Sequence, residues 1–486
     1  MPDAEAPAPG ARRTVRNRLI ALGVTLAVLA PLAYLWATSL VPSSYSATDM
    51  GYADYGGGAA AHHQHHGGRS VADLTGPRSG VADVAVTLTA RKQTFSLPSG
   101  ESVDGYTLNG SSPGPLIRAA VGDLVEVTLV NESVPDGATL HWHGIDVPNA
   151  EDGVAGVTQD AVPIGGRHVY RFVASGAGTY WYHSHQVSSE QVRNGLFGAI
   201  VIGAAERDVI AAIHTYDGRR TINGSTGASR VEVPAGTTLR VRTINTDNAL
   251  IRVGLVGASY QLVAVDGREL HGPTPTTSAF PLAAGARADF EVTVPATGLR
   301  LDAGGVGLTI APPGVQTPVD SLSSATIDLL TYGKPTAPGL DVSNPDRTFE
   351  YRIGRRPGFL DGVPGLWWTI NGHKYPDVPM FMVTAGDVVK MKISNTSGQS
   401  HPMHLHGHHA LVLSRNGVPS SGTPWWTDTL EVGDDETYEI AFLADNPGVW
   451  MDHCHNLPHA SQGLMTHLMY EGISTPYKIG DGNEPE

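Results

Sequence analysis

The segment Gly122-Asp-Leu-Val-Glu-Val-Thr-Leu-Val-Asn131 recurs twice more in this chain of 486 residues. The related segments are Gly236-Thr-Thr-Leu-Arg-Val-Arg-Thr-Ile-Asn245 and Gly386-Asp-Val-Val-Lys-Met-Lys-Ile-Ser-Asn395. In the second and third copies, apolar residues alternate with arginine or lysine, which is the pattern of a half-buried β-strand. The intervals between the copies each suit one β-sandwich of roughly 100 residues plus insertions. The sequence therefore predicts three homologous all-β domains, at residues 81–205, 206–338 and 339–475.

A second element recurs only in the outer two domains. Gly178-Thr-Tyr-Trp-Tyr-His-Ser-His185 parallels Gly448-Val-Trp-Met-Asp-His-Cys-His455, and the first histidine follows the glycine by five residues in both. The middle domain has the strand that leads into this element, Phe290-Glu-Val-Thr-Val-Pro-Ala-Thr-Gly298, but no histidines follow it. We therefore expect the outer domains to carry the chemistry and the middle domain to act as a spacer.

The composition narrows the class of protein. Hydrophobic residues make up 41% of the chain and charged residues 16%, as in a globular protein, and 58 glycines with 34 prolines indicate many turns. The formal net charge of −15 argues against nucleic acid as a partner of the folded part. The single cysteine, Cys454, excludes an intrachain disulfide.

The region before the first domain predicts a membrane anchor. Residues 19–41 form an uncharged apolar run, close to the length that a helix needs to cross a bilayer. Residues 1–18 form a basic tail that places the N-terminus in the cytoplasm and the domains outside, by the positive-inside rule. A cleaved signal peptide, with secretion of the protein, is the alternative. The arginines of the tail are Arg12, Arg13, Arg16 and Arg18.

Residues 42–80 predict a flexible stalk, because they are rich in glycine, alanine, serine and histidine. Its histidines either capture metal near the membrane or are incidental in a solvated linker. Residues 476–486 are expected to form a C-terminal tail. Because every repeat and every cluster described below lies beyond residue 80, we expect the chain without residues 1–80 to remain active. The stalk histidines are His62, His63, His65 and His66.

Four histidine clusters occupy equivalent points of the two outer domains. Two of them are His-x-His pairs, which place both imidazoles on the same face of a strand because side chains alternate with a period of two. Imidazole is a ligand for copper, zinc, iron and nickel, and a thiolate from Cys454 beside the histidines would reduce the number of metals that fit. The clusters are His141-Trp-His143, His183-Ser-His185, His401-Pro-Met-His404-Leu-His406, and His453-Cys454-His455 with His459.

All four clusters match the motifs of the multicopper oxidases, which this chain resembles over residues 81–475. The resemblance implies three cupredoxin-like Greek-key sandwiches and four copper ions: one type 1, one type 2 and two type 3. It implies that Cys454, His401 and His459 bind the type 1 copper, and that His141 and His404 bind the type 2 copper. It further implies that His143, His183 and His455 hold one type 3 copper, and that His185, His406 and His453 hold the other.

The His453-Cys454-His455 triplet also suggests a path for electrons. Cys454 binds the type 1 copper, while the two neighbouring histidines point to the opposite face and reach the trinuclear cluster. At the family's axial position, ten residues after the cysteine, stands Leu464, and Met465 follows it. Read without a gap, the type 1 copper therefore lacks a thioether ligand, which favours a higher reduction potential. A shift of one residue would restore methionine.

An acidic residue follows the first cluster at the position where the family has an acid beside the trinuclear copper. This residue is Asp152, and we expect it to supply protons to reduced oxygen. Glu151 is the rival candidate for this role. Alternatively, Asp152 is only a solvated carboxylate of the loop. Asp146 is expected at the surface.

The resemblance implies a laccase-like enzyme that oxidises phenols or aromatic amines one electron at a time and reduces dioxygen to water. A metal oxidase that acts on Cu(I) or Mn(II) is an alternative, although the chain has only nine methionines and no cluster of them. A non-catalytic cupredoxin scaffold is a second alternative, but such a protein would have lost ligands. The expected partners are a small donor, dioxygen and, through the N-terminal helix, the cell membrane, with a monomeric catalytic part outside the cytoplasm.

The sole cysteine makes the assignment testable by colour. We expect the copper-loaded protein to be intensely blue and Cys454→Ser to lose that absorption, because only this thiolate can give thiolate-to-copper charge transfer. Visible absorption spectra of the two proteins check this. Blue absorption that survives in Cys454→Ser would contradict the type 1 assignment.

Overall fold

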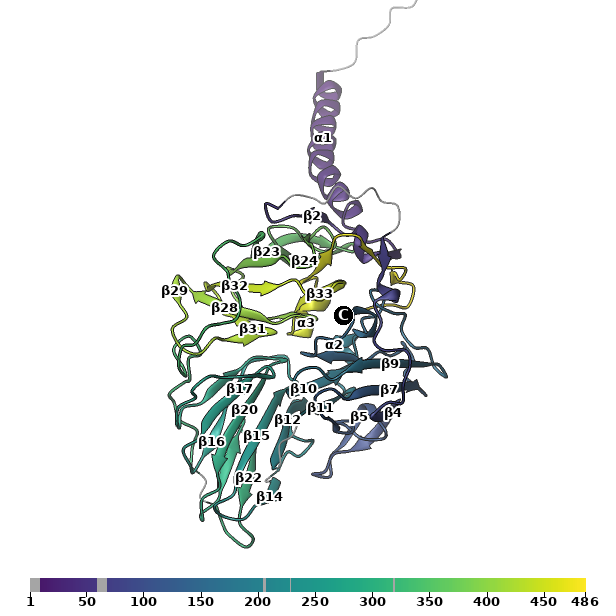
Figure 1. The fold of residues 1–486 in the computed structure, drawn as a ribbon. Helices are drawn as coiled ribbons and strands as arrows, with labels where there is room; N and C mark the ends of the chain where they lie inside the picture. Colours follow the sequence, from purple (N-terminus) through teal and green to yellow (C-terminus); the bar gives the residue numbers. More distant parts are fainter. Residues whose placement is uncertain (1–8, 59–67, 204–206, 228, 318–319) are drawn as a thin grey trace, which may run out of the picture.

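The molecule is built almost entirely of β-strands. The computed structural model describes residues 9–58, 68–203, 207–227, 229–317 and 320–486. Figure 1 shows three bodies of strands, with one long helix, α1 (Pro9–Ala37), rising from one end. Each body has two sheets whose side chains share a buried core; in the first, Leu88 and Val127 of one sheet join Ile200 of the other. The predicted all-β fold with three sandwiches is confirmed.

The three sandwiches follow one another along the chain. The first contains β5 (Ser102–Leu108), β4 (Val84–Ser96), β7 (Leu124–Asn131) and β9 (Arg167–Val173), facing β6 (Ile117–Ala119), β11 (Phe197–Ile202), β10 (Gly178–His183) and β8 (His141–His143). The second contains β13 (Arg219–Ile222), β12 (Asp208–Tyr216), β15 (Thr238–Asn245), β20 (Arg287–Thr293), β17 (Gln261–Val265) and β18 (Arg268–Glu269), facing β14 (Ser229–Glu232), β22 (Gly307–Ala311), β21 (Leu299–Asp302), β16 (Ile251–Val256) and β19 (Phe280–Leu282).

The third sandwich is the largest. One sheet contains β24 (Val363–Ile370), β23 (Arg347–Leu360), β26 (Val388–Asn395), β32 (Thr437–Leu443), β28 (Ala410–Arg415) and β29 (Val418–Pro419), with β30 (Trp426–Thr427) beside β28. The other contains β2 (Tyr52–Asp54), β25 (Pro379–Val383), β34 (Met465–Tyr470), β33 (Val449–Cys454), β27 (His401–Leu405) and β31 (Thr429–Val432).

The repeated segment forms the same strand in each sandwich. β7, β15 and β26 pair in parallel with β4, β12 and β23, respectively, and each pairs antiparallel with a later strand. The asparagine that ends each strand is fully buried, and its side-chain amide donates to a backbone carbonyl of Val162, Leu282 or Val432, beyond its own strand. This role explains why asparagine closes all three copies: Asn131, Asn245 and Asn395.

The prediction of a flexible stalk at residues 42–80 is wrong for the described residues 42–58 and 68–80. β1 (Ser44–Tyr45) pairs with β36 (Ile479–Gly480), β2 extends the sheet of β25, and β3 (Arg69–Ser70) pairs with β35 (Ile473–Ser474). Two 3-10 turns, η1 (Ala47–Asp49) and η2 (Val71–Asp73), also lie here. Apolar side chains within these segments are buried in the core of the third sandwich. The histidines His62, His63, His65 and His66 lie outside the described residues.

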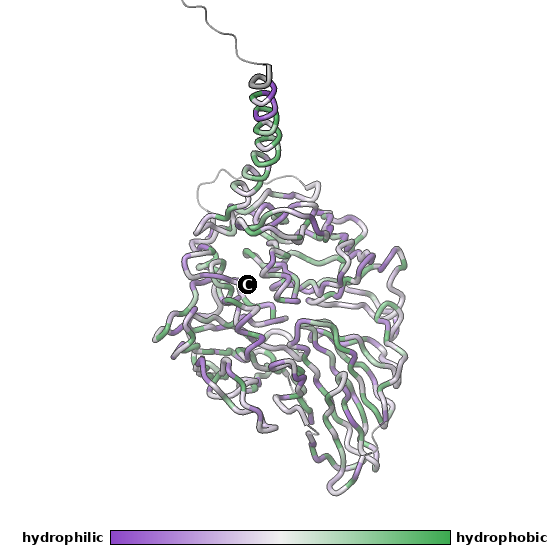
Figure 2. Tube along the Cα trace, turned by 180° about the vertical axis from the view of Figure 1, so that it is seen from behind, coloured by the Kyte–Doolittle hydropathy of each residue, from purple (hydrophilic) through white to green (hydrophobic). Residues whose placement is uncertain are grey.

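Two ends of the chain differ in their surroundings. The helix α1, mostly hydrophobic in Figure 2, is long and apolar enough over Arg13–Ala37 to cross a membrane. Its described side chains are exposed along that length. Residues 476–486, predicted to be a tail, instead lie against the first sandwich: the Val187 amide donates to the Glu484 carbonyl over 2.6 Å.

Packing of the segment before the first sandwich changes the expectation for truncated proteins. We now expect loss of residues 1–41 to leave the resistance to guanidinium unfolding nearly unchanged, because α1 contributes little to the core. Loss of residues 1–80 should lower it, since Ala47, Met50 and Val71 are at most 2% exposed. Removing buried side chains of this size costs on the order of 3 kcal/mol or more. Guanidinium titrations followed by circular dichroism compare the two; equal midpoints would contradict this prediction.

Candidate metal centre

The predicted clusters lie on four strands and on the turns that follow them. β8 carries His141 and His143, and antiparallel pairing sets His183 of β10 directly opposite His141. In the third sandwich, His404 of β27 lies opposite His453 of β33. These pairings place imidazoles from both sandwiches at one interface, where the middle sandwich contributes none of them. His459 lies on the short helix α3 (Leu457–Ser461).

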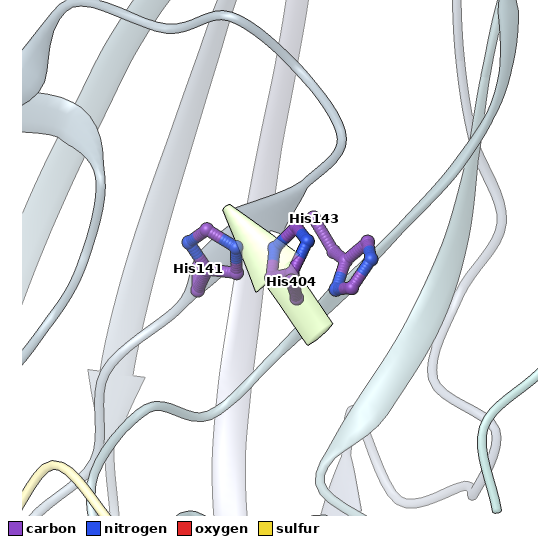
Figure 3. A group of neighbouring side chains, drawn as sticks. All are labelled: His141, His143 and His404. Atoms are coloured by element: carbon purple, nitrogen blue, oxygen red, sulfur yellow. The ribbon is translucent and has the colours of Figure 1, made fainter. Parts of the chain in front are cut away.

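Eight of the histidines form three neighbouring groups. In each group, one ligand atom from every residue lies within 4.8 Å of the others. Figure 3 shows the first group, in which the rings of His143 and His404 stack with centroids 3.7 Å apart. The eight side chains are at most 1% exposed. The groups are His141, His143 and His404; His143, His183 and His455; and His185, His406 and His453.

The outer nitrogens of these rings are fixed by hydrogen bonds. The Nδ1–H of His141 donates to the Asp152 carbonyl and that of His404 to the Asp428 carbonyl, both over 2.9 Å. His143 is turned the other way, with Nε2 3.1 Å from the Thr429 hydroxyl. Such bonds fix the tautomer and the direction of the free lone pair.

Several of the inner nitrogens have no hydrogen-bond partner although they are buried. They include Nε2 of His141, His183 and His404, Nδ1 of His143, and both nitrogens of His455. A buried polar atom without a hydrogen bond is costly. The inward lone pairs therefore fit a set of metal ions that would satisfy them.

Burial also sets the charge of these rings. It lowers the pKa of His143 and His404 well below the ordinary value, and repulsion from neighbouring imidazoles lowers it further. The pKa of His453 is lowered to about 3, again mainly by burial. These three rings are thus neutral at neutral pH, which is the form that binds metal.

A separate group contains the sulfur. The thiol of Cys454 is fully buried, with Sγ 3.5 Å from Nδ1 of His401 and 3.8 Å from Nδ1 of His459. The Nε2 of His401 is held by the Ser397 hydroxyl at 2.8 Å. Two imidazoles and a thiolate in one trigonal set suit an electron-transfer copper.

The indole of Trp368, on β24, covers this second group. Its ring centroid lies 4.5 Å from that of His459 and 4.8 Å from that of His401. The guanidinium of Arg355 lies over the same indole at 4.4 Å. No motif of the sequence indicated either residue, because the hairpin that carries them lies far from the ligands along the chain.

The pairing of β33 with β34 bears on Leu464 and Met465. His453 is opposite Met465, so Cys454 is opposite Leu464, whose carbonyl accepts the Cys454 amide over 3.0 Å. Residues directly opposite each other in antiparallel strands point to the same face. Leu464 therefore shares the face of the thiol, and Met465 shares the face of His453.

The three acidic residues of the first cluster have different surroundings. Asp152 is 1% exposed, with Oδ1 3.1 Å from Nδ1 of His141 and Oδ2 3.0 Å from Nδ1 of His406. Glu151 turns away and accepts the amides of Gly76 and Arg171. Asp146 is exposed, as expected.

Two further carboxylates touch the histidines and were missed in the sequence. Oδ1 of Asp428 lies 3.3 Å from Nε2 of His143, and the Asp428 carboxylate forms an ion pair with the Arg287 guanidinium. Glu486 places Oε1 3.1 Å from Nδ1 of His453, and burial raises the pKa of Glu486 to about 8. Neither residue belongs to a periodic pattern or a motif, so only the tertiary structure reveals them.

Comparisons with known proteins agree with this geometry. Residues 89–207 and 348–472 each match a family model described as multicopper oxidase. The chain is 28% identical over 472 residues to a multicopper oxidase of Mycobacterium tuberculosis, covering 82% of this chain and 89% of that protein. It is 28% identical over 463 residues to a laccase of Botryotinia fuckeliana, covering 79% and 82%. A crystal structure of a multi-copper oxidase from Pseudomonas thermotolerans superposes with a TM-score of 0.65 at 28% identity, covering 81% of this chain and all of that one.

The strand register predicts the effect of an added thioether. We expect Leu464→Met to lower the reduction potential of a copper ion bound at Cys454, because a weak thioether donor on that face favours Cu(II). Met465→Leu, on the opposite face, is the matched control and should leave the potential unchanged. Redox titration of the blue absorption measures both. The register is wrong if only the Met465 variant shifts the potential.

Proposed function

The chain belongs to the multicopper oxidase family and is a laccase-like oxidoreductase with copper as its cofactor, and from this premise we propose which residues hold each ion. The type 1 copper would be held by Cys454, His401 and His459, with Leu464 on the face of the thiol. The type 2 copper is held by His141 and His404. The type 3 pair is held by His143, His183 and His455 on one side, and by His185, His406 and His453 on the other.

The observation that carries this assignment is the set of orphaned inner nitrogens. Buried, neutral imidazoles with fixed outer nitrogens offer ligand atoms in groups that match the four sites. Bound copper would accept electrons singly from the donor and deliver four of them to dioxygen, which is reduced to water. The alternation of β33 sends Cys454 to one face and its two histidine neighbours to the other, so a few covalent bonds join the two sites.

Asp152 is suited to hold and deliver protons. Each of its carboxylate oxygens faces the Nδ1 of a different ligand histidine, so it is next to the trinuclear group without occupying it. Reduced oxygen is strongly basic, and a carboxylic acid held nearby acts as a general acid. Glu151 is unsuited to this role because two backbone amides and a nearby guanidinium already hold it elsewhere.

The surroundings of His459 favour an aromatic donor over a metal cation. The Arg355 guanidinium, which lies over the buried Trp368 indole beside His459, repels Cu(I) and Mn(II) but attracts a phenolate. We therefore place phenols and aromatic amines first among the donors. Oxygen uptake by the copper-loaded protein with a phenol, compared with Cu(I) and Mn(II), tests this order. Uptake with the metal ions alone would overturn it.

The membrane helix and the monomeric state belong to the same proposal. α1 serves as an uncleaved anchor, since it is apolar over its length and follows a basic tail. This orientation puts the sandwiches outside the cytoplasm. A monomer suffices, because the ligands of all four sites come from one chain.

Substitution of the proposed proton donor should slow one half of the cycle. Asp152→Asn keeps the size of the side chain but removes its acid proton, so reoxidation of the fully reduced protein in air should slow by about 100-fold. Anaerobic reduction of the blue copper by a phenol should stay fast. Stopped-flow absorption measures both half-reactions, and copper analysis confirms four ions per chain. Reoxidation that slows in Glu151→Gln, but not in Asp152→Asn, would refute the assignment.

A further inference from the structure

The hairpin of β23 and β24 is fastened to the end of the membrane helix. The Asp361 amide, at the turn of the hairpin, donates to the Ser39 carbonyl over 2.9 Å, and the Val41 amide donates to Asp361 Oδ1 over 3.2 Å. A Cβ placed on Gly362 would lie 2.8 Å from the indole nitrogen of Trp36. Figure 1 shows β23 and β24 at the end of the molecule from which α1 rises. The turn of the hairpin therefore lies where the proposed anchor leaves the bilayer.

Apolar surface continues from α1 onto this hairpin. Trp36 and Leu40 at the end of the helix are 46% and 47% exposed, and Val363 and Leu366 on β24 are 54% and 49% exposed. Exposed apolar side chains that adjoin a membrane helix favour contact with lipid. Arg356, exposed on the same hairpin, adds a positive charge that suits anionic headgroups.

The register of the hairpin joins the turn to the type 1 site along one face. Arg355 is opposite Trp368, Pro357 is opposite Leu366, and Phe359 is opposite Pro364. Every second pair along a hairpin shares a face, so these three pairs form one row. The row begins at Trp368, whose indole touches the His459 ring, and runs through apolar side chains to the turn at α1.

The loop after His459 packs against the same turn. A Cβ placed on Gly463 would lie 2.7 Å from Tyr375 Cβ and 3.7 Å from Leu360 Cδ2. Leu360 is the last residue of β23, next to the turn. The type 1 ligand His459 is thus within a few residues of the membrane-facing end by two independent routes.

We propose that the donor of this enzyme is a lipid-soluble hydroquinone that moves from the bilayer to the type 1 site along the row of Phe359, Pro364, Pro357 and Leu366. The inference rests on the proposed anchor and oxidase activity, and it names their substrate. Two hydroquinones lose four electrons and four protons and become two quinones. One dioxygen gains those electrons and protons and becomes two waters. The hydroquinone ring lies at the Arg355 end of the row, separated from His459 by the buried Trp368 indole through which its electrons pass, and the apolar row accommodates its alkyl chain.

A water-soluble donor has a separate approach. A cavity of about 740 Å³ lies between the second and third sandwiches and includes Ser400, next to the type 1 ligand His401. Charged residues such as Asp328 and Arg415 line it together with apolar ones such as Phe280 and Trp425, and none of the lining residues belongs to the hairpin. A small polar donor therefore serves as an internal reference for a change made on the hairpin.

The test uses the full-length, copper-loaded protein in vesicles of phosphatidylcholine and phosphatidylglycerol. Oxygen uptake is measured with a decyl-substituted ubiquinol that partitions into the bilayer and with unsubstituted hydroquinone in water. We expect Leu366→Glu to lower the ratio of kcat/KM for the decyl donor over that for hydroquinone about tenfold. Val418→Glu, which charges a residue of similar exposure (59%) on the separate strand β29, is the matched control and should keep the parent ratio.

Other outcomes discriminate between this inference and the function on which it rests. Retained blue absorption and flotation with the vesicles show that Leu366→Glu is folded and anchored. An unchanged ratio in that variant, with parent activity intact, overturns the lipid route alone. A parent protein that does not consume oxygen with hydroquinone overturns the oxidase assignment itself, and one that does not float with vesicles overturns the anchor.

Discussion

The ion pair between Arg287 and Asp428 is the constraint on which the metal centre depends. Two nitrogens of the guanidinium meet the two carboxylate oxygens at 2.7 and 2.6 Å, and both side chains are fully buried. Burial alone would raise the pKa of Asp428, but Arg287 holds it well below its ordinary value. Removing one partner of such a pair leaves a buried charge and costs about 3–5 kcal/mol.

Through this ion pair the middle sandwich contributes to the metal centre, although it supplies none of the histidines. Arg287 belongs to β20 of that sandwich, donates to the Thr179 carbonyl of the first, and binds Asp428 of the third. Asp428 in turn contacts His143 through its carboxylate and His404 through its carbonyl. One arginine therefore sets the distance between ligands from different sandwiches, and the predicted spacer aligns the site as well as separating its neighbours.

The sequence predicted what local chemistry dictates. Strand alternation placed the histidines in pairs, and the repeated Gly-to-Asn segments located three sandwiches because a buried amide is needed at each strand end. It missed Asp428, Glu486 and Trp368, which meet the histidines only when distant strands come together. The stalk was misread because residues rich in glycine and serine have the composition of a linker, whereas Met50 and Val71 are anchored by a core formed far along the chain. Composition indicates how flexible a segment is in isolation, and here tertiary contacts with the third sandwich restrict that flexibility.

The sequence distance between the ligands has a consequence for how the protein acquires its metal. His185 bonds to the Pro485 carbonyl, 300 residues away, and His143 to Thr429, 286 residues away. Contacts this remote close late in folding, after each sandwich has formed its own core. The three histidine groups are therefore complete only when the first and third sandwiches are docked. Metal affinity at these groups thus depends on the docking of the sandwiches as well as on the fold of each one.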